Sequence, residues 1–382
     1  MCEEILVPKL RFSGFDDDWQ ETTLNDIATF SKGKGISKND ISEEGIECVR
    51  YGELYTKYGE LIYNIDSKTN LNKNELVLSN KNDILIPCSG ETAIDLATAS
   101  CIQKEQVAIG GDITIIQTKQ YAPFITYYLN QKKNEIARFA QGVSIVHLYS
   151  KDFKSLKMKI PSINEQKKII SLLELLTKKE QLLEQKYQYY QEFKKYLMQQ
   201  IFAQKLRFAN FDDDWEIKKL GNIVEFLDNK RIPLNEDERS NQKDIYPYYG
   251  ASGIIDYVED YIFDEELILI GEDGTIDVNL ASGKYWVSNH AHVLRANKNI
   301  NQHYLLEFLK TVHFEIYNTG TIQPKLNKET CKSIPIKIPK SLEEQKLIAN
   351  CLFEVNNRIK ICQKQINITN KFKKGLLQQM FV

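Results

Sequence analysis

The chain has 382 residues, of which 42% are hydrophobic, with 50 Lys and Arg against 52 Asp and Glu. This is enough for two ordinary domains, each with a core of its own. A net charge of −2 does not mark the whole chain as a nucleic-acid-binding protein, so any such surface has to be local. No apolar run approaches the roughly 20 residues of a membrane-spanning helix, and the first residues lack the pattern of a signal peptide.

The cysteines are scattered along the chain, and none of them forms a Cys-x-x-Cys pair. Their odd number and their spacing argue against a disulfide framework and against a structural zinc site. They fit reduced thiols, and we therefore expect a cytoplasmic protein. The cysteines are Cys2, Cys48, Cys88, Cys101, Cys331, Cys351 and Cys362.

A duplicated segment is the most informative feature of the sequence. Residues 9–19 read Lys-Leu-Arg-Phe-Ser-Gly-Phe-Asp-Asp-Asp-Trp, and residues 205–215 read Lys-Leu-Arg-Phe-Ala-Asn-Phe-Asp-Asp-Asp-Trp. Only two of these eleven positions differ, which indicates an internal repeat. Adjacent aspartates point in different directions in a strand or loop, so we interpret each Asp triplet as a structural corner and not as a metal site.

The region after the first copy of this segment is rich in expected strands. Short apolar runs between Gly and Asn or Asp turns predict strands at residues 75–78, 83–86 and 113–116. A helix is expected around residues 124–139, and the segment Gly142–Leu148 follows it.

A long helix is expected from about residue 162. Pro161 ends any earlier helix, and Ser162-x-x-Glu165 matches a capping box, in which each side chain satisfies a free backbone donor at a helix start. The helix runs to Phe193-Lys-Lys-Tyr-Leu-Met-Gln-Gln-Ile-Phe202. About 38 residues at ~1.5 Å each give a rod roughly 57 Å long.

The second half of the chain repeats this order. A strand is predicted at residues 267–270, a helix around residues 304–317, and a glycine segment at 320–326. Pro339 and the capping box Ser341-x-x-Glu344 then open a second long helix, which ends in a match to residues 193–202.

Both long helices carry apolar residues with a seven-residue period, typical of the a and d positions of a coiled coil. Two repeats related by a pseudo-dyad would pair these helices antiparallel. Two tandem domains with unrelated linkers would leave the matched helices without partners. The residues expected to pair the helices are Ile169, Leu176, Leu183, Tyr190, Leu197, Ile348, Leu352, Val355, Ile359, Ile366 and Leu376.

The sequence contains no recognisable catalytic motif. His290 and His292 alternate as in a strand and have no third ligand nearby in the sequence, so no metal site is expected. Residues 271–274, Gly-Glu-Asp-Gly, are too short for a phosphate-binding loop, and no Walker lysine follows them. We therefore expect a protein that is not itself an enzyme.

The duplicated motifs, in this order, resemble the specificity subunits of type I restriction-modification systems. The resemblance rests on the Ile-Pro-x-x-x-Glu-Gln opening of the long helices, on residues 248–255 and 270–274, on Asn289-His290, and on the closing segment 320–326. It implies an α+β fold: two strand-rich target-recognition domains with a pseudo-two-fold relation, joined by two long antiparallel coiled-coil helices. The expected parts are residues 1–160 (N-terminal segment and first recognition domain), 161–203 (central helix), 204–338 (second recognition domain) and 339–382 (distal helix).

The resemblance also implies a function. Each recognition domain would read one part of a two-part, asymmetric target in double-stranded DNA, and the helices would fix the spacing and dock two methyltransferase subunits. S-adenosylmethionine would belong to those partners, and ATP and Mg to two restriction subunits where these join, so this chain needs no cofactor. The rival is a scaffold that presents two binding domains on a helical rod without any role on DNA.

Residues for DNA contact are expected in the loops of both domains. Lysines would bind phosphates, and arginine or glutamine side chains would read base edges in the major groove. The candidates in the first domain are Lys32, Lys34, Lys38, Arg50, Tyr51, Ser144 and His147. The candidates in the second domain are Lys230, Arg231, Tyr248, Tyr249, Thr321, Gln323 and Lys325.

Overall fold

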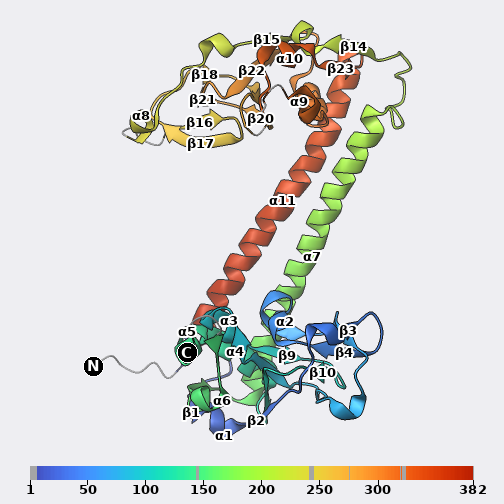
Figure 1. Ribbon diagram of the computed structural model, residues 1–382. Helices are drawn as coiled ribbons and strands as arrows, with labels where there is room; N and C mark the ends of the chain where they lie inside the picture. The colour runs from blue at the N-terminus through green and yellow to red at the C-terminus, as the bar shows by residue number, and fades with distance from the viewer. Residues whose placement is uncertain are drawn as a thin grey trace. The chain divides into compact units, whose positions relative to one another are not determined.

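The computed structural model describes residues 7–142, 146–240, 245–274, 276–318, 320 and 324–381. The chain divides into two compact units, one made of Met1–Leu182 with Ile366–Val382 and the other of Leu183–Gln365. Each unit therefore combines one of the expected strand-rich domains with a stretch of each long helix (Figure 1).

The first unit is built on a five-stranded sheet with an almost wholly apolar interior. Ile84, Leu85 and Ile116 in its central strands are fully buried, as are Phe124 and Leu129 of the covering helix α4 (Ala122–Gln131). The strand order is β2 (Ala28–Lys32), β11 (Ile113–Thr118), β7 (Ile84–Pro87), β9 (Ser100–Ile102) and β5 (Leu61–Ile62).

Smaller elements complete the first unit. A four-stranded sheet has the order β10 (Ala108–Ile109), β4 (Ile46–Val49), β6 (Lys68–Thr69) and β3 (Ile41–Ser42). Two strand pairs are β1 (Gln20–Thr23) with β13 (Lys157–Ile160) and β8 (Ser89–Gly90) with β12 (Val146–His147). The short helices are α1 (Leu24–Ile27), η1 (Lys38–Asp40), α2 (Tyr51–Thr56), η2 (Lys73–Glu75), α3 (Ala93–Leu96), α5 (Lys133–Ala137) and α6 (Ser150–Phe153).

The second unit repeats this plan with two four-stranded sheets. One has the order β15 (Val224–Phe226), β22 (Ala291–Ala296), β19 (Leu267–Gly271) and β20 (Val278–Ala281); the other is β17 (Gly253–Val258), β16 (Tyr246–Gly250), β21 (Lys284–Val287) and β18 (Phe263–Asp264). β14 (Glu216–Lys219) pairs with β23 (Pro335–Ile338). The short helices are η3 (Leu220–Asn222), η4 (Asp228–Lys230), α8 (Glu236–Ser240), α9 (Gln302–Leu309), η5 (Phe314–Tyr317) and α10 (Lys328–Ser333).

The long helices are α7 (Ile163–Phe202) and α11 (Leu342–Met380). In the first unit, Ile169 and Leu173 near the start of α7 share a core with Leu376 and Met380 near the end of α11. In the second unit, Leu197 and Ile201 near the end of α7 share a core with residues near the start of α11, among them Ile348 and Leu352. The helices therefore pack antiparallel in each unit, and the expected fold class is confirmed.

The residues expected to pair the helices all lie on α7 or α11, and none of them is exposed. Ile169, Leu197, Ile348, Leu352, Val355, Ile366 and Leu376 are buried. Leu176, Leu183, Tyr190 and Ile359 are half-buried. The seven-residue period thus follows the covered side of each helix.

Three of the short elements differ from the sequence-based expectation. Residues 75–78 do not form a strand, because this stretch contributes only an isolated bridge from Leu78 to Ala108. The helix expected at 124–139 is divided into α4 and α5 at Lys132, and the one expected at 304–317 into α9 and η5. Apolar periodicity alone does not predict these interruptions.

The capping boxes at the starts of the long helices are only half formed. Ser162 and Ser341 accept the backbone N–H of Glu165 and Glu344, each at 3.4 Å, as a cap requires. The glutamate side chains, however, bind arginines of the duplicated segment. Arg11 lies 2.7 Å from Glu165, and Arg207 lies 2.8 Å from Glu344.

Candidate nucleic-acid interface

In the first unit, the loops that contain Gly33 and Gly110 pack closely together beside the candidate DNA-binding residues. A Cβ added to Gly33 would lie 2.0 Å from the carbonyl oxygen of Gly110, so only glycine allows the two loops to approach this closely. The backbone N–H of Lys34 donates to the carbonyl of Ile109 (3.0 Å). The approach fixes Lys32 and Lys34 on either side of Gly33, both with exposed side chains.

An exposed tyrosine gathers several cations next to this loop. Tyr149 is 39% exposed, and the ammonium groups of Lys32 and Lys151 lie 5.8 and 5.6 Å from its ring centroid. The ring of His147 stacks on it at 6.1 Å, and His147 Nδ1 lies 3.0 Å from the hydroxyl of Ser89. Cations over an aromatic face form a surface that suits a phosphate backbone and stacked bases.

Arg50 and Tyr51 lie at the start of α2, beside Gly110. The Arg50 side chain is 28% exposed and lies 3.9 Å from Glu53, and Tyr51 is 38% exposed. Burial acts to raise the pKa of Glu53, but hydrogen bonds from Ser67, the Arg50 backbone and Lys57 outweigh it and hold that pKa below its ordinary value. Lys38 is exposed on η1.

In the second unit, a buried histidine joins the corresponding loops. His292, fully buried, lies with Nδ1 2.9 Å from Asp228, and its Nε2 donates to the carbonyl of Leu326 (2.7 Å). Burial acts to raise the pKa of Asp228, but hydrogen bonds from His292 and from the backbone of Val293 hold it below its ordinary value. The start of η4 is thereby fixed to the segment around Leu326.

Arg231 is committed to structure within the protein. Its guanidinium donates to Glu272 (2.8 Å) and to the backbone carbonyls of Asp228, Asn289 and Ala291. Its side chain is only 15% exposed. We interpret Arg231 as a residue that positions these loops, whereas the neighbouring Lys230 is exposed.

Lys325 and His290 converge on one carboxylate. Lys325 Nζ lies 3.2 Å from Asp273 Oδ1, and His290 Nδ1 lies 3.3 Å from Asp273 Oδ2. The side chains of Lys325 and His290 are 50% and 54% exposed.

The two tyrosines proposed from sequence in the second unit differ in burial: Tyr248 lies in the interior, and Tyr249 is half-buried. Tyr248 is 1% exposed, and its hydroxyl accepts the backbone N–H of Leu234. Tyr249 is half-buried against Tyr285 at 5.5 Å. The side chain of Tyr248 therefore supports β16 and is not available to a base. Ser144, Thr321 and Gln323 lie outside the described residues.

The strand registers place these clusters at equivalent positions. Lys32 lies opposite Thr114 in the first unit, and Asp228 follows β15 next to His292 in the second. Opposite Ser89 lies His147, and opposite Asp273 lies Lys325. Equivalent positions thus carry different polar groups on one scaffold. The equivalent residues, with that of the first unit given first, are Lys32 and Asp228, Cys88 and Glu272, Ser89 and Asp273, Thr114 and His292, and His147 and Lys325.

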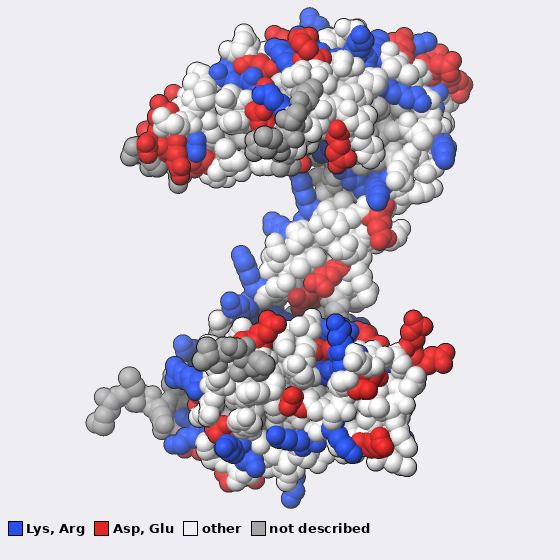
Figure 2. Space-filling model, in the orientation of Figure 1, with Lys and Arg blue, Asp and Glu red and all other residues white. Residues whose placement is uncertain are grey.

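Sequence reasoning missed Ser89, Tyr149, Lys151, Asp273 and His292 as parts of these clusters. The signal that finds most of them is the repeat itself, because the register of paired strands aligns residues whose types differ. On the faces of the two units that Figure 2 shows, cations and acids are interspersed. Within the described ranges, there is no group of three or more His, Cys, Asp or Glu that could hold a metal ion.

Comparison with known proteins identifies the family. The model of the type I restriction modification DNA specificity domain matches residues 16–190 and again residues 212–370. The chain therefore belongs to this family, which confirms the resemblance and the DNA-specificity function expected from the sequence.

Relatives agree with this membership. The type I restriction enzyme MjaVIII specificity subunit of Methanocaldococcus jannaschii is 23% identical over 94% of this chain and 91% of its own length. A putative type I specificity subunit of Haemophilus influenzae, S.HindORF215P, is 35% identical, but the match spans 32% of this chain and 33% of that protein.

Solved structures share the fold. The S subunit of a type I restriction-modification system from M. genitalium superposes with a TM-score of 0.71 at 17% identity, over 98% of this chain and 99% of that one. A chain from a structural study of assembly and conformational transition in a type I system gives 0.55 at 14% identity, over 96% and 98%. No helix in the described part of the chain is long and apolar enough to cross a membrane.

Proposed function

We propose that this chain reads a two-part, asymmetric DNA target, with one part recognised by each strand-rich domain, while its helices hold methyltransferase subunits. The observation that carries the proposal is the pair of equivalent clusters with different chemistry. A single scaffold that presents Ser89 and His147 in one copy and Asp273 and Lys325 in the other suits two half-sites of different sequence.

The proposed contacts divide into two kinds. Contacts to phosphates set the register of the protein on DNA. The candidates for these contacts are Lys32, Lys34, Lys38, Lys151 and Lys230. Arg50, Tyr51, His147 and Lys325 are the candidates for base edges. Tyr248 and Arg231 are assigned structural roles because their side chains are committed within the protein.

A repeated apolar stripe on the long helices supports the docking of two partners. Leu182, Tyr189 and Phe193 of α7 are 56%, 62% and 37% exposed. Ile361, Ile368 and Phe372 of α11, each 179 positions later, are 54%, 56% and 55% exposed. In each helix the three residues fall within about 40° of one another and roughly 100° from the covered seam. Two equal stripes suit two copies of one partner, and exposed apolar stripes of this kind mark interaction sites.

Catalysis and cofactors are assigned to the partners in this proposal. S-adenosylmethionine would be bound by the methyltransferase subunits, and ATP and Mg by the two restriction subunits of systems that cut DNA. The chain itself would supply sequence recognition and spacing.

Single-molecule sequencing for methyladenine tests the proposal. Cells carrying this chain with its cognate methyltransferase subunit are compared with cells that lack only this chain. We expect a gapped, two-part methylated motif that disappears without the chain. If the methyltransferase partner is competent and no motif depends on the chain, the proposal is wrong.

A further inference from the structure

One position in each recognition domain is held by a short polar side chain across a strand pair. In the first unit, Ser89 of β8 lies opposite His147 of β12. In the second unit, Asp273 forms the matching bridge with Lys325. The backbone N–H of the next residue, Leu148 or Leu326, donates to the carbonyl of Cys88 (2.9 Å) or Glu272 (2.8 Å). The two positions are therefore structurally equivalent.

The contact at this position differs in kind between the units. Ser89 Oγ and His147 Nδ1 form a contact between a hydroxyl and an imidazole at 3.0 Å. Asp273 and Lys325 form an ion pair at 3.2 Å, and His290 approaches the other carboxylate oxygen at 3.3 Å. Burial acts to raise the pKa of Asp273, but hydrogen bonds from Lys325 and His290 outweigh it and hold the pKa below its ordinary value.

We propose that Ser89 and Asp273 are positioning residues that orient His147 and Lys325 toward DNA, and that this equivalent position determines one base of each half-site. The proposal rests on the function proposed above and adds to it the residues that set specificity. The side chain of Lys325 is 50% exposed and that of Asp273 is 31% exposed, so Asp273 restrains Lys325 without covering it.

The chemistry of the two side chains differs in what each can read. A lysine ammonium only donates, so a restrained Lys325 matches a base edge that presents acceptors, as guanine does with O6 and N7. A histidine whose Nδ1 is engaged by Ser89 offers Nε2, which donates or accepts according to the tautomer. The two half-sites are thus expected to differ at this position, with guanine selected in the half read by the second unit.

The test uses the full chain with its methyltransferase partner and the target that the wild-type complex methylates. Competition binding is measured with duplexes that carry every single-base substitution, one at a time. Lys325→Ala and Asp273→Ala should each lose about 5- to 150-fold of discrimination at one and the same position of one half-site, the range that corresponds to 1–3 kcal/mol for a good base contact. Asp273→Asn, which keeps an acceptor without the charge, should lose less.

Matched variants separate positioning from general damage. The double variant Asp273→Ala with Lys325→Ala should be no worse than Lys325→Ala alone, because Asp273 acts through Lys325. Glu329→Gln removes another Lys–carboxylate pair of the same unit, with Lys332, and should leave the discrimination unchanged. Ser89→Ala should alter one position in the other half-site.

Three outcomes decide the matter. A loss confined to one base position supports the proposal. An equal loss of affinity for every duplex assigns Asp273 to folding or phosphate contact and overturns it, as does an unchanged profile. If the wild-type complex itself shows no two-part target, the proposed function fails first, so the two failures are distinguishable.

Discussion

At the scale of residues, the most informative contacts join the duplicated segment to the long helices. Arg11 and Arg207 bind Glu165 and Glu344, whose side chains are each 1% exposed. Both arginines also donate to the backbone of the Asp triplet, through the carbonyls of Asp17 and Asp213 at 2.5 Å. The expected corner beside each tryptophan is therefore held by an arginine that reaches a buried glutamate.

Arg207→Ala should destabilise the second unit by about 3 kcal/mol, because removing one partner leaves a buried carboxylate without its cation. Among the described residues, the Glu344 side chain would keep the indole N–H of Trp215 (3.2 Å) as its donor. The free energy of unfolding, from urea titration followed by tryptophan fluorescence, measures the loss. Glu329→Gln, at an exposed pair, is the control and should change stability by less than about 1 kcal/mol. Equal effects of the two variants would contradict this assignment.

Asp228 should make the stability of the second unit sensitive to acid. Its pKa in the folded chain is held below the ordinary value, so its stabilising contribution is present above about pH 4 and is lost as the pH falls through the folded pKa. Asp228→Asn removes this contribution. The difference in stability between wild type and variant should therefore be largest near neutral pH and should shrink over the interval in which the pH falls from about 4 through the folded pKa. A difference that stays constant over that interval would be evidence against the pair with His292.

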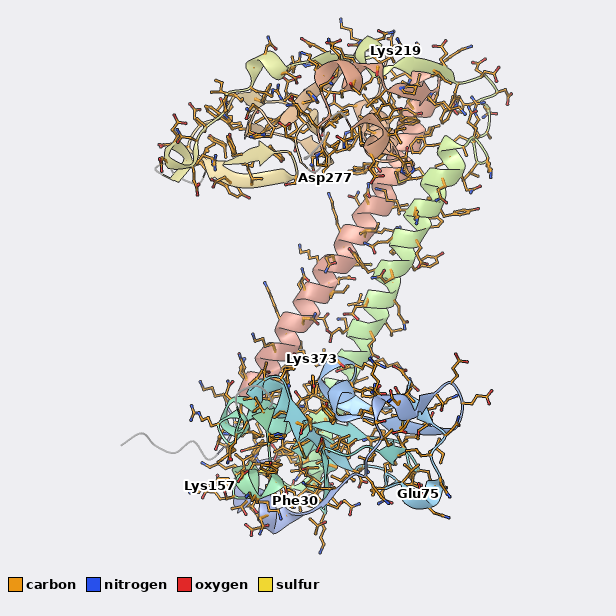
Figure 3. The ribbon with its side chains drawn as sticks, viewed as in Figure 1. Phe30, Glu75, Lys157, Lys219, Asp277 and Lys373 are labelled. Carbon is orange, nitrogen blue, oxygen red and sulfur yellow. The ribbon has the colours of Figure 1, made fainter. Side chains whose placement is uncertain are left out.

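At the scale of elements, each long helix has two apolar sides, of which one is covered within the protein and the other is exposed. The seven-residue period of α7 and α11 is covered by the partner helix and the recognition domain of each unit, while the stripe of Leu182, Tyr189 and Phe193 is left exposed. Ion pairs such as Lys373 with Glu180, at 3.6 Å, flank the covered side (Figure 3 labels Lys373). A side that is apolar but uncovered points to a partner.

If two methyltransferase subunits dock on the helices as proposed, replacing Tyr189 and Phe193 by serine should remove one of them, because only one of the equal stripes is lost. The mass of the purified complex, from native mass spectrometry, gives the number of subunits directly. Ile368→Ser with Phe372→Ser should remove the other. Gln188→Ser, an exposed polar change on α7, is the control and should retain both. Retention of both subunits in all variants would show that the partners dock elsewhere.

At the scale of the whole molecule, each recognition domain is closed where it joins the helices. Gln20 pairs with Ile160, and Glu216 pairs with Ile338, so each domain enters and leaves through one two-stranded sheet. An equivalent glutamine anchors each junction. Gln166 accepts the backbone N–H of Tyr121 at 3.0 Å, and Gln345 accepts the backbone N–H of Asn301 at 2.8 Å. The domains are thus inserts on a common framework.

Replacing residues 20–160 by a second copy of residues 216–338 should therefore give a folded chain with two identical readers. Because the same reader would then occupy both places of the duplicated framework, both parts of the methylated target should become the same half-site sequence. Sequencing for methyladenine reads this out, and the unaltered chain is the control. A motif that keeps the half-site of the removed domain would contradict the assignment of one half-site to each domain.

The sequence by itself determined the plan of this protein. The repeat at residues 9–19 and 205–215, the proline and serine before each long helix, and the seven-residue period are all properties of the linear order, and local backbone preferences act on them directly. They were sufficient for the fold class, for the two long helices and for the family. The contact residues of the recognition domains were predicted from loop position and residue type alone.

Only the tertiary structure decided which of those side chains are available. Glu165 and Glu344 complete no capping box, because arginines 154 and 137 positions away in the chain bind them more strongly. Tyr248 and Arg231 are committed within the second unit, and residues 75–78 form no strand. Ser89 and Asp273 gain their roles only when strand pairing brings His147 and Lys325 beside them. Such pairings join distant parts of the chain. Local sequence does not determine which distant group will contact a given side chain, because that contact depends on how the whole domain packs.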